Sequence, residues 1–325
     1  MMAASDFGMR SPRFDVTIAG ELNLDLILYG SPEEIPRERE LLVSDVNLTL
    51  GSSSAILAHN LASLGSRVGF VSSIGSDQFG EMVVSRLSAA GVDLSKVAVL
   101  DGRKTGLTVI MQRDHWRNML TYPGTIFDLR FDDLDLEYLI SARHFHFSSF
   151  YLQRGLQADI PRLFKKLKSA GLTVSLDCND DPEGRWQGGI HDALQNVDVF
   201  LPNAREAMYL TGAKNVEAAA EELSRLVPLV VIKLGADGAF ARQGDTRWTS
   251  PALKIDVIDP VGAGDSFDAG FLHEYLRGSD IARCLASGNV AGALSVTRAG
   301  GTEAFRDAAH REQFLQQHLY ATPAK

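Results

Sequence analysis

The chain has 325 residues, of which 45% are hydrophobic and 22% are charged, and its formal net charge is −9. This length and composition suit one large α/β domain with ample apolar material for a core. The surplus of negative charge argues against a nucleic-acid or anionic-membrane partner, because both bind basic surfaces, but it does not argue against a phosphorylated ligand.

Short β-rich runs alternate with helical patterns along the chain. Residues 1–13 have no such pattern and no signal-peptide core, so we expect a disordered terminus. The predicted strands are 14–20, 66–75, 144–150, 172–177, 197–203 and 229–235, and the predicted helices are 55–65, 79–91, 160–171 and 204–212. Several of the strands are almost continuously apolar, which is typical of a parallel sheet covered on both faces. The alternation therefore predicts a doubly wound α/β domain.

Two segments interrupt this alternation. Residues of about 22–50 and 104–123 have the pattern of antiparallel strands with polar turns. We expect them to form one small sheet laid over the larger one, as a lid that excludes water from a phosphoryl-transfer site.

The sequence DPVGAGDSFDAGFL (259–272) predicts a glycine-rich turn that leads into a helix. Gly262 and Gly264 allow the backbone to approach a ligand closely, and the helix start directs free N–H groups at the loop. Such a site binds anions and suits a phosphate. Asp265 has two interpretations from the residues alone: a helix cap, or a base that takes a proton from a second substrate.

The cysteines and the apolar runs bear on the compartment. Cys178 and Cys284 are in no CxxC motif and do not make a disulfide framework, so we expect a reducing cytoplasm. No apolar run approaches the roughly 18–20 residues that span a bilayer.

The segment DPVGAGDSFDAGF resembles the C-terminal signature of the PfkB (ribokinase-like) carbohydrate kinase family, and the resemblance extends from about residue 14 to 305. It implies a three-layer α/β/α fold, with a mostly parallel central sheet and a small β-sheet lid, as a single domain over 1–325. It also implies that Asp265 is the catalytic base and that the backbone of Gly262, Ala263 and Gly264 forms the anion hole.

The same resemblance indicates an acceptor pocket near the start of the chain. GELNLD (20–25) resembles the strand-end motif that binds sugar hydroxyls, which assigns Asn23 and Asp25 to the acceptor. The segment GSSSAILAHNLASLG (51–65) departs from the family pattern. Its Gly51 is retained, but Ile56 stands where a substrate-binding Asn is usual. Asn60, one turn further along, is then the candidate replacement.

For the nucleotide, NAREA (203–207) matches the family's N-x-x-E motif, which implies that Asn203 and Glu206 organise phosphate and Mg²⁺, the latter through water. A capping box would account for the same two residues. Lys233 and Gly235 correspond to the strand and turn that contact the nucleotide, Asn289 to the approach to adenine, and Asp259 to a monovalent-cation site.

These correspondences imply an ATP-dependent sugar kinase with Asp265 as general base. They also imply that it uses Mg²⁺ and, like many members of the family, K⁺. A nucleoside kinase of the adenosine or inosine type is the alternative within the same fold. A catalytically silent protein that binds a sugar or nucleotide is a third reading, prompted by the altered GSSS segment. The β-rich lid further predicts a homodimer.

Overall fold

The structure is a computed structural model that describes residues 12–113 and 116–320. The expectation of disorder over 1–13 therefore falls almost entirely outside the described residues. A nine-stranded sheet in the order β13-β12-β11-β10-β9-β8-β1-β4-β5 forms its centre. Its strands are β1 (Phe14–Ala19), β4 (Val68–Gly75), β5 (Asp93–Leu100), β8 (Ala142–Ser148), β9 (Thr173–Asp177), β10 (Val199–Phe200), β11 (Leu229–Lys233), β12 (Ala239–Gln243) and β13 (Thr246–Ser250). Within the described residues, the antiparallel pairs of this sheet are β11–β12 and β12–β13, and its other neighbouring strands pair parallel.

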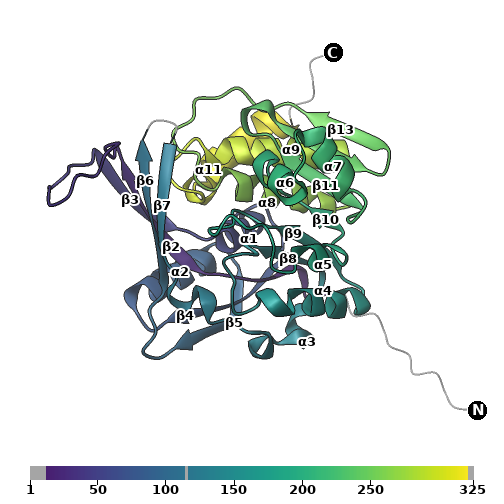
Figure 1. Ribbon diagram of the computed structural model, residues 1–325, viewed down its shortest axis with the longest axis horizontal. Helices are drawn as coiled ribbons and strands as arrows, with labels where there is room; N and C mark the ends of the chain where they lie inside the picture. Colours follow the sequence, from purple (N-terminus) through teal and green to yellow (C-terminus); the bar gives the residue numbers. More distant parts are fainter. Residues whose placement is uncertain (1–11, 114–115, 321–325) are drawn as a thin grey trace, which may run out of the picture.

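Helices cover both faces of this sheet (Figure 1). One layer contains α1 (Ser53–Ser63), α2 (Gln78–Ala89), α8 (Ala263–Leu276) and α9 (Ile281–Ser295); the other contains α3 (Leu136–Leu139), α4 (Ile160–Ser169), α5 (Ile190–Leu194), α6 (Ala204–Thr211) and α7 (Val216–Leu223). The short helices α10 (Glu303–Arg306) and α11 (Ala308–Leu315) close the described C-terminal part. The expected three-layer α/β/α architecture is confirmed.

Alternation along the strands explains why two cores form. On β11, Val230 and Ile232 are buried in one core, whereas Leu229 and Val231 of the same strand are buried in the other. Because successive side chains of a strand point to opposite faces, a run of apolar residues fills both layers. Among the described residues, none of the helices combines the length and apolarity that crossing a lipid bilayer requires.

The small sheet stands at one side of the molecule (Figure 1), in the order β3-β2-β6-β7. Its strands are β2 (Asn23–Tyr29), β3 (Asp45–Leu50), β6 (Gly106–Arg113) and β7 (Trp116–Tyr122). The expectation of antiparallel strands holds within each hairpin but is wrong for the central pair, because β2 runs parallel to β6. The two hairpins lie side by side through their first strands, which run in the same direction.

Candidate active site

The turn before α8 leaves backbone amides free. Gly262 has a φ of 73° and ends the turn, and the helix begins at Ala263. The amides of Gly262, Gly264 and Asp265 have no hydrogen-bond acceptor among the described residues, since the first helical bond into this turn comes from Ser266. These three N–H groups and the positive end of the helix dipole form an anion-binding site. We call the turn that carries them, residues 259–265, the anion loop.

The predicted anion hole needs one correction. The amide of Ala263 donates to the carbonyl of Pro260 at 3.3 Å, and that of Val261 donates to the Asp259 carboxylate at 2.9 Å. Ala263 therefore contributes backbone shape but not a free donor. The amide of Asp265 takes its place, because it lies in the first helical turn, where no carbonyl is within reach.

Ile56 packs under this turn and is 2% exposed. A Cβ placed on Gly262 would lie 2.6 Å from the Cα of Gly301 and 3.3 Å from Cδ1 of Ile56. Gly262 is therefore required both by its positive φ and by this close packing. Ile56, which stands where a substrate-binding Asn is usual, therefore packs beneath the loop and fills the space there.

Asn60 is likewise not an acceptor ligand. It is fully buried, and its side-chain amide donates to Ser266 Oγ at 2.9 Å and to the carbonyl of Gly301 at 3.0 Å. Its Oδ1 faces Nδ1 of His59 at 2.9 Å. With these groups engaged inside the protein, Asn60 supports the start of α8 from below.

Asp265 is half-buried at the floor of this site. Burial and the charge of Asp177 raise its pKa to about 6, although the Lys233 ammonium and a hydrogen bond from Ser53 act in the opposite direction. A carboxylate with a pKa just below neutrality is ionised at pH 7 and still basic enough to accept a proton. Asp265 is thus not a simple exposed cap.

Asp25 reaches the same site from the lid strand β2. It is 6% exposed, and burial together with the charge of Asp265 raises its pKa to about 7. A Cβ on Gly51 would lie 2.2 Å from Oδ1 of Asp25, so only glycine leaves this carboxylate in place. Asn23 begins β2, is also buried, and its side-chain amide donates to the carbonyl of Leu24 at 3.1 Å.

The unusual GSSS segment has a structural partner that sequence reasoning missed, the buried Glu21. Ser54 donates from Oγ to a Glu21 carboxylate oxygen at 2.7 Å, and Ser149 donates to the other at 2.8 Å. Ser52 donates to the Glu21 carbonyl at 2.6 Å and holds a φ of 70°, a conformation that favours glycine. The serines therefore compensate for a buried acid, whose pKa burial raises.

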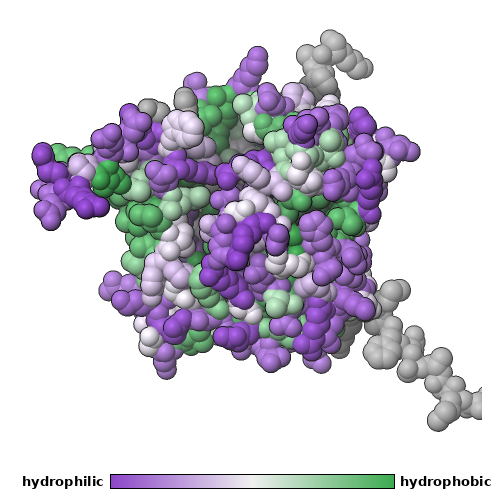
Figure 2. Space-filling model, viewed as in Figure 1, coloured by the Kyte–Doolittle hydropathy of each residue, from purple (hydrophilic) through white to green (hydrophobic). Residues whose placement is uncertain are grey.

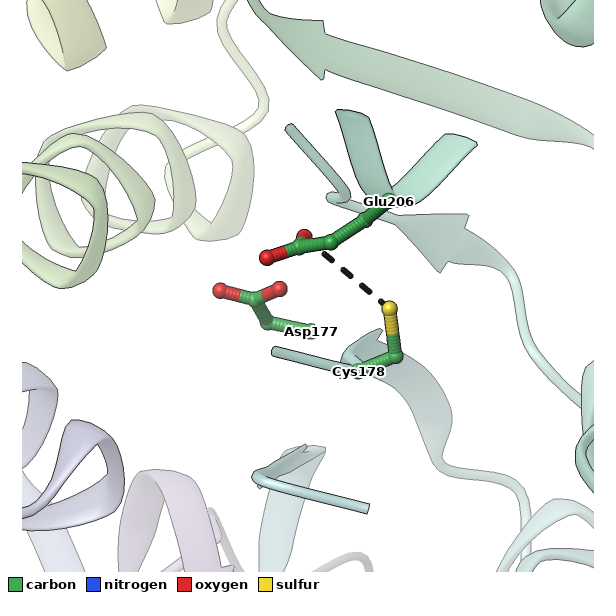
Figure 3. Close-up of side chains that lie close together, drawn as sticks. All are labelled: Asp177, Cys178 and Glu206. Atoms are coloured by element: carbon green, nitrogen blue, oxygen red, sulfur yellow. Dashed lines mark hydrogen bonds between the residues drawn. The ribbon is translucent and has the colours of Figure 1, made fainter. Parts of the chain in front are cut away.

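Glu206 and Asn203 form the capping box at the start of α6. The amide of Asn203 donates to Glu206 Oε2 at 2.8 Å, and the amide of Glu206 donates to Asn203 Oδ1 at 2.9 Å. Figure 3 shows Glu206 beside Asp177 and Cys178, whose candidate ligand atoms all lie within 4.8 Å of one another. Burial and the charge of Asp177 raise the pKa of Glu206 to about 7.

The donor set of this cluster suits a hard cation. Two carboxylates are the oxygen ligands that Mg²⁺ prefers, and Mg²⁺ keeps several waters, so a second-shell role for Glu206 fits. Burial raises the pKa of the Cys178 thiol well above its usual range, so its sulfur stays protonated and is no ligand for such an ion.

Three of the predicted nucleotide residues lie in different settings. Gly235 is exposed in the turn after β11, with a φ of 61°. Asn289 on α9 donates from its amide to the carbonyl of Ser250 at 2.9 Å and so fastens the end of β13. Lys233 is largely buried, and its ammonium contacts Asp177 at 2.7 Å and Asp268 at 2.9 Å.

Asp259 is fully buried and joins three parts of the chain. Its Oδ1 accepts from the Val261 amide, and its Oδ2 accepts from the Gly300 amide at 2.9 Å and from the Tyr29 hydroxyl at 2.7 Å. Any cation here would use only the lone pairs that these three donors leave. The carboxylate therefore holds the anion loop and the lid strand together.

Residues 13–308 match the family described as pfkB family carbohydrate kinase. The chain belongs to this family. A Bacillus subtilis 2-dehydro-3-deoxygluconokinase is 30% identical over 79% of this chain and 84% of its own. A Thermococcus kodakarensis cytidine kinase is 29% identical over 84% of this chain and 93% of its own.

Among solved structures, an E. coli protein described as a candidate ribokinase II, in complex with ATP and Mg²⁺, superposes with a TM-score of 0.82. It is 25% identical and the match covers 94% of this chain and all of that chain. As a member of the pfkB family, the protein is a carbohydrate kinase, that is, a phosphotransferase with an alcohol group as acceptor. The sequence predicted this activity.

Proposed function

We propose that this kinase transfers the γ-phosphoryl group of ATP to a hydroxyl of a small carbohydrate, with Asp265 as general base. The observation that carries the proposal is the placement of Asp265 beside three unpartnered amides and opposite the buried Asp25. Asp265 takes the hydroxyl proton as the acceptor oxygen bonds to the γ-phosphorus and the bond to the departing ADP breaks. The amides of Gly262, Gly264 and Asp265 stabilise the charge on the transferred group.

Mg²⁺·ATP is the proposed phosphoryl donor, supported by the ATP and Mg²⁺ complex of the E. coli relative. Asp177 and Glu206 would hold the ion, directly or through water, and bound Mg²⁺ neutralises phosphate charge in such transfers. We assign Gly235 to the nucleotide side of the site, with Asn203 positioning Glu206. Asn289 shapes the adenine side by fastening the end of β13, since its amide donates to Ser250.

The acceptor is assigned to Asn23, Asp25 and Gly51, under the lid. Asp25 is the anchor, because its buried carboxylate gains a partner when a hydroxyl donates to it. We infer a sugar or sugar acid as the acceptor class, supported by the 2-dehydro-3-deoxygluconokinase relative. A nucleoside acceptor is the second candidate, and the relative named cytidine kinase favours it.

A substrate panel separates these readings. Purified protein is incubated with Mg²⁺·ATP and, in separate assays, ribose, fructose, 2-keto-3-deoxygluconate, adenosine, inosine and cytidine, with ADP release as the readout. We expect turnover with a member of the sugar group. Turnover with nucleosides alone would move the assignment to a nucleoside kinase. ATP binding by calorimetry without ADP release for any acceptor would favour the silent binding protein.

Three further proposals concern the setting of the enzyme. We propose that the enzyme resides in a reducing cytoplasm, which is consistent with its two buried free thiols. We propose a homodimer formed through the lid, which is tested below. We also assign a K⁺ site to Asp259, where the ion would meet only the lone pairs that the three hydrogen bonds of that carboxylate leave.

A further inference from the structure

Lys233 forms a buried bridge between two carboxylates that sequence reasoning did not connect. Its Nζ lies 2.7 Å from Oδ2 of Asp177, and 2.9 and 3.2 Å from the two oxygens of Asp268. The lysine side chain is 11% exposed, and the two aspartate side chains are 2% and 1% exposed. The three N–H bonds of the ammonium are therefore spent on these carboxylates and not on a nucleotide phosphate.

The bridge joins three elements at the floor of the site. Asp177 ends β9, Lys233 ends β11, and Asp268 lies on α8 one turn after Asp265. A Cβ on Gly264 would lie 3.7 Å from the lysine Nζ, so the ammonium is directly beneath the anion loop. The bridge therefore fastens the first turn of α8 to the carboxyl ends of two parallel strands.

A buried ion pair is weak grounds for stability, because desolvation offsets much of its attraction. This bridge also brings acids together: Asp177 and Asp268 face one ammonium, with Asp265 close by. If stability alone were served, apolar side chains would pack this space at least as well. The site itself explains the arrangement better, because the bridge sets where α8 begins.

We propose that the Asp177–Lys233–Asp268 bridge is a positioning device that holds the first turn of α8, with its three free amides and Asp265, in the geometry needed for phosphoryl transfer. Lys233 and Asp268 are thus positioning residues. The inference rests on the proposed function and assigns Lys233 a role other than nucleotide contact.

Electrostatics around Asp265 agree with this placement. The groups that face it from neighbouring elements are Asp177 from β9, Lys233 from β11, Ser53 from α1, Arg117 from β7 and Asp25 from β2. Asp177 raises the pKa of Asp265, whereas Lys233, Ser53 and Arg117 lower it. Loss of the lysine therefore leaves Asp265 harder to ionise, in addition to leaving two buried carboxylates without a partner.

The test compares Lys233→Met, Lys233→Arg and the double variant Lys233→Met/Asp268→Asn with wild type. Lys233→Met should lose thermal stability and at least about tenfold in kcat, since small displacements of reacting groups are costly. The double variant removes one uncompensated charge and gives Asp177 an amide partner, so stability should largely return while kcat stays low. Lys233→Arg should recover part of kcat. In Lys233→Met, the acid limb of the pH profile of kcat/KM should move to higher pH, because Asp265 is harder to ionise.

Lys168→Met is the matched control. It removes another lysine–aspartate bridge, 2.5 Å from Nζ of Lys168 on α4 to Oδ1 of Asp198, which comes directly before β10 and lies away from the site. It should lower stability without changing kcat or the acid limb. Wild-type kcat in the double variant would overturn the proposal. So would a raised KM for ATP in Lys233→Met with kcat and the acid limb unchanged, since that pattern means nucleotide contact.

If the wild type produces no ADP with any acceptor, the proposed function is refuted. The positioning role of the bridge is then tested by amide hydrogen exchange. Exchange at the hydrogen-bonded amides of Ala263 and Ser266 should quicken in Lys233→Met and not in Lys168→Met. Equal exchange in the two variants would overturn the positioning role by itself.

Discussion

The Tyr29 hydroxyl, on lid strand β2, donates to Oδ2 of Asp259 over 2.7 Å, and the other oxygen of that carboxylate holds the Val261 amide. The lid is therefore tied to the anion loop through one buried side chain. A displacement of the lid strand therefore also displaces the anion loop, so closure of the lid over the acceptor is coupled to phosphate binding.

Tyr29→Phe removes this tie and leaves the ring in place. We expect the KM of the acceptor to rise about three- to tenfold, because a hydrogen bond to a charged group contributes ~1.5–3 kcal/mol and only part of it depends on lid closure. Steady-state kinetics with the best acceptor from the panel measure the effect. Tyr138→Phe is the control, since Tyr138 donates to Asp93 outside the lid. Equal effects of the two variants on KM would contradict the link.

Gly262→Ala tests the shape of the anion loop. Its φ of 73° and the 2.6 Å approach to the Gly301 Cα leave no room for a methyl group, so the loop must shift. We expect a loss of stability and a fall in kcat of about 10²-fold. Gly244→Ala is matched in backbone, with a φ of 57° and nothing within 4 Å of the added Cβ. It should cost stability alone; a similar kcat for both variants would remove the loop from the mechanism.

The raised pKa of Asp25 makes a prediction about stability and pH. Its folded pKa of about 7 exceeds the ordinary 3.8, so the folded state binds the proton more tightly, and this contribution is fully present below pH 3.8 and lost as pH rises through 7. Asp25→Asn should therefore be more stable than wild type at pH 8, by roughly 4 kcal/mol. The gain should vanish near pH 4.

Asp135→Asn is the control of opposite sign. A hydrogen bond from Lys96 lowers the pKa of Asp135, so its contribution is present above the ordinary pKa and lost as pH falls through the folded value. This variant should be less stable than wild type at pH 8, and the deficit should shrink in acid. Thermal unfolding from pH 2.5 to 8 measures both, because the Asp135 deficit shrinks only below its ordinary pKa of 3.8. A parallel pH trend for the two variants would be inconsistent with the assignment.

The lid edge is the predicted dimer surface. β7 is an edge strand, and its large hydrophobic side chains are exposed, with Trp116 at 82% and Leu120 at 61%. Figure 2 shows hydrophobic side chains on the flank of the lid, between its hydrophilic tip and the body. An unpaired edge strand with apolar side chains favours pairing with a second copy.

Sedimentation equilibrium should give a dimer for wild type and a monomer for Leu120→Asp. Val99→Asp is the control, because Val99 is 60% exposed on β5, the edge of the large sheet. It should leave the dimer intact. A monomeric wild type at micromolar concentration, or dissociation by both variants alike, would exclude the lid interface.

The sequence predicted the central parallel strands well, because strands buried on both faces are apolar throughout. It missed β5, β12 and β13, which lie toward the two edges of the large sheet. The edge strands β5 and β13 are half-exposed and interleave residues such as Lys96 and Thr246 with apolar ones, so their pattern resembles a loop. The strand β12 is mostly buried but has only five residues. Burial differs between centre and edge, and only the centre leaves a clear sequence signal.

The site was predictable where the backbone dictates the residue. Gly262 and Asp265 stand in a short local pattern, and the structure places both at the free amides. The roles of Asp177 and Asp268 were not predicted, because these residues lie 56 and 35 positions, respectively, from Lys233 in the sequence. Asn60 was misassigned because linear spacing does not reveal which side of α1 meets the loop.

Turnover of Asp265→Asn tests the central claim most directly. Loss of the base should lower kcat by at least ~10²-fold, while the variant remains folded and still binds ATP by calorimetry. Unchanged kcat in a folded Asp265→Asn enzyme, measured as ADP release with the preferred acceptor, would contradict the account.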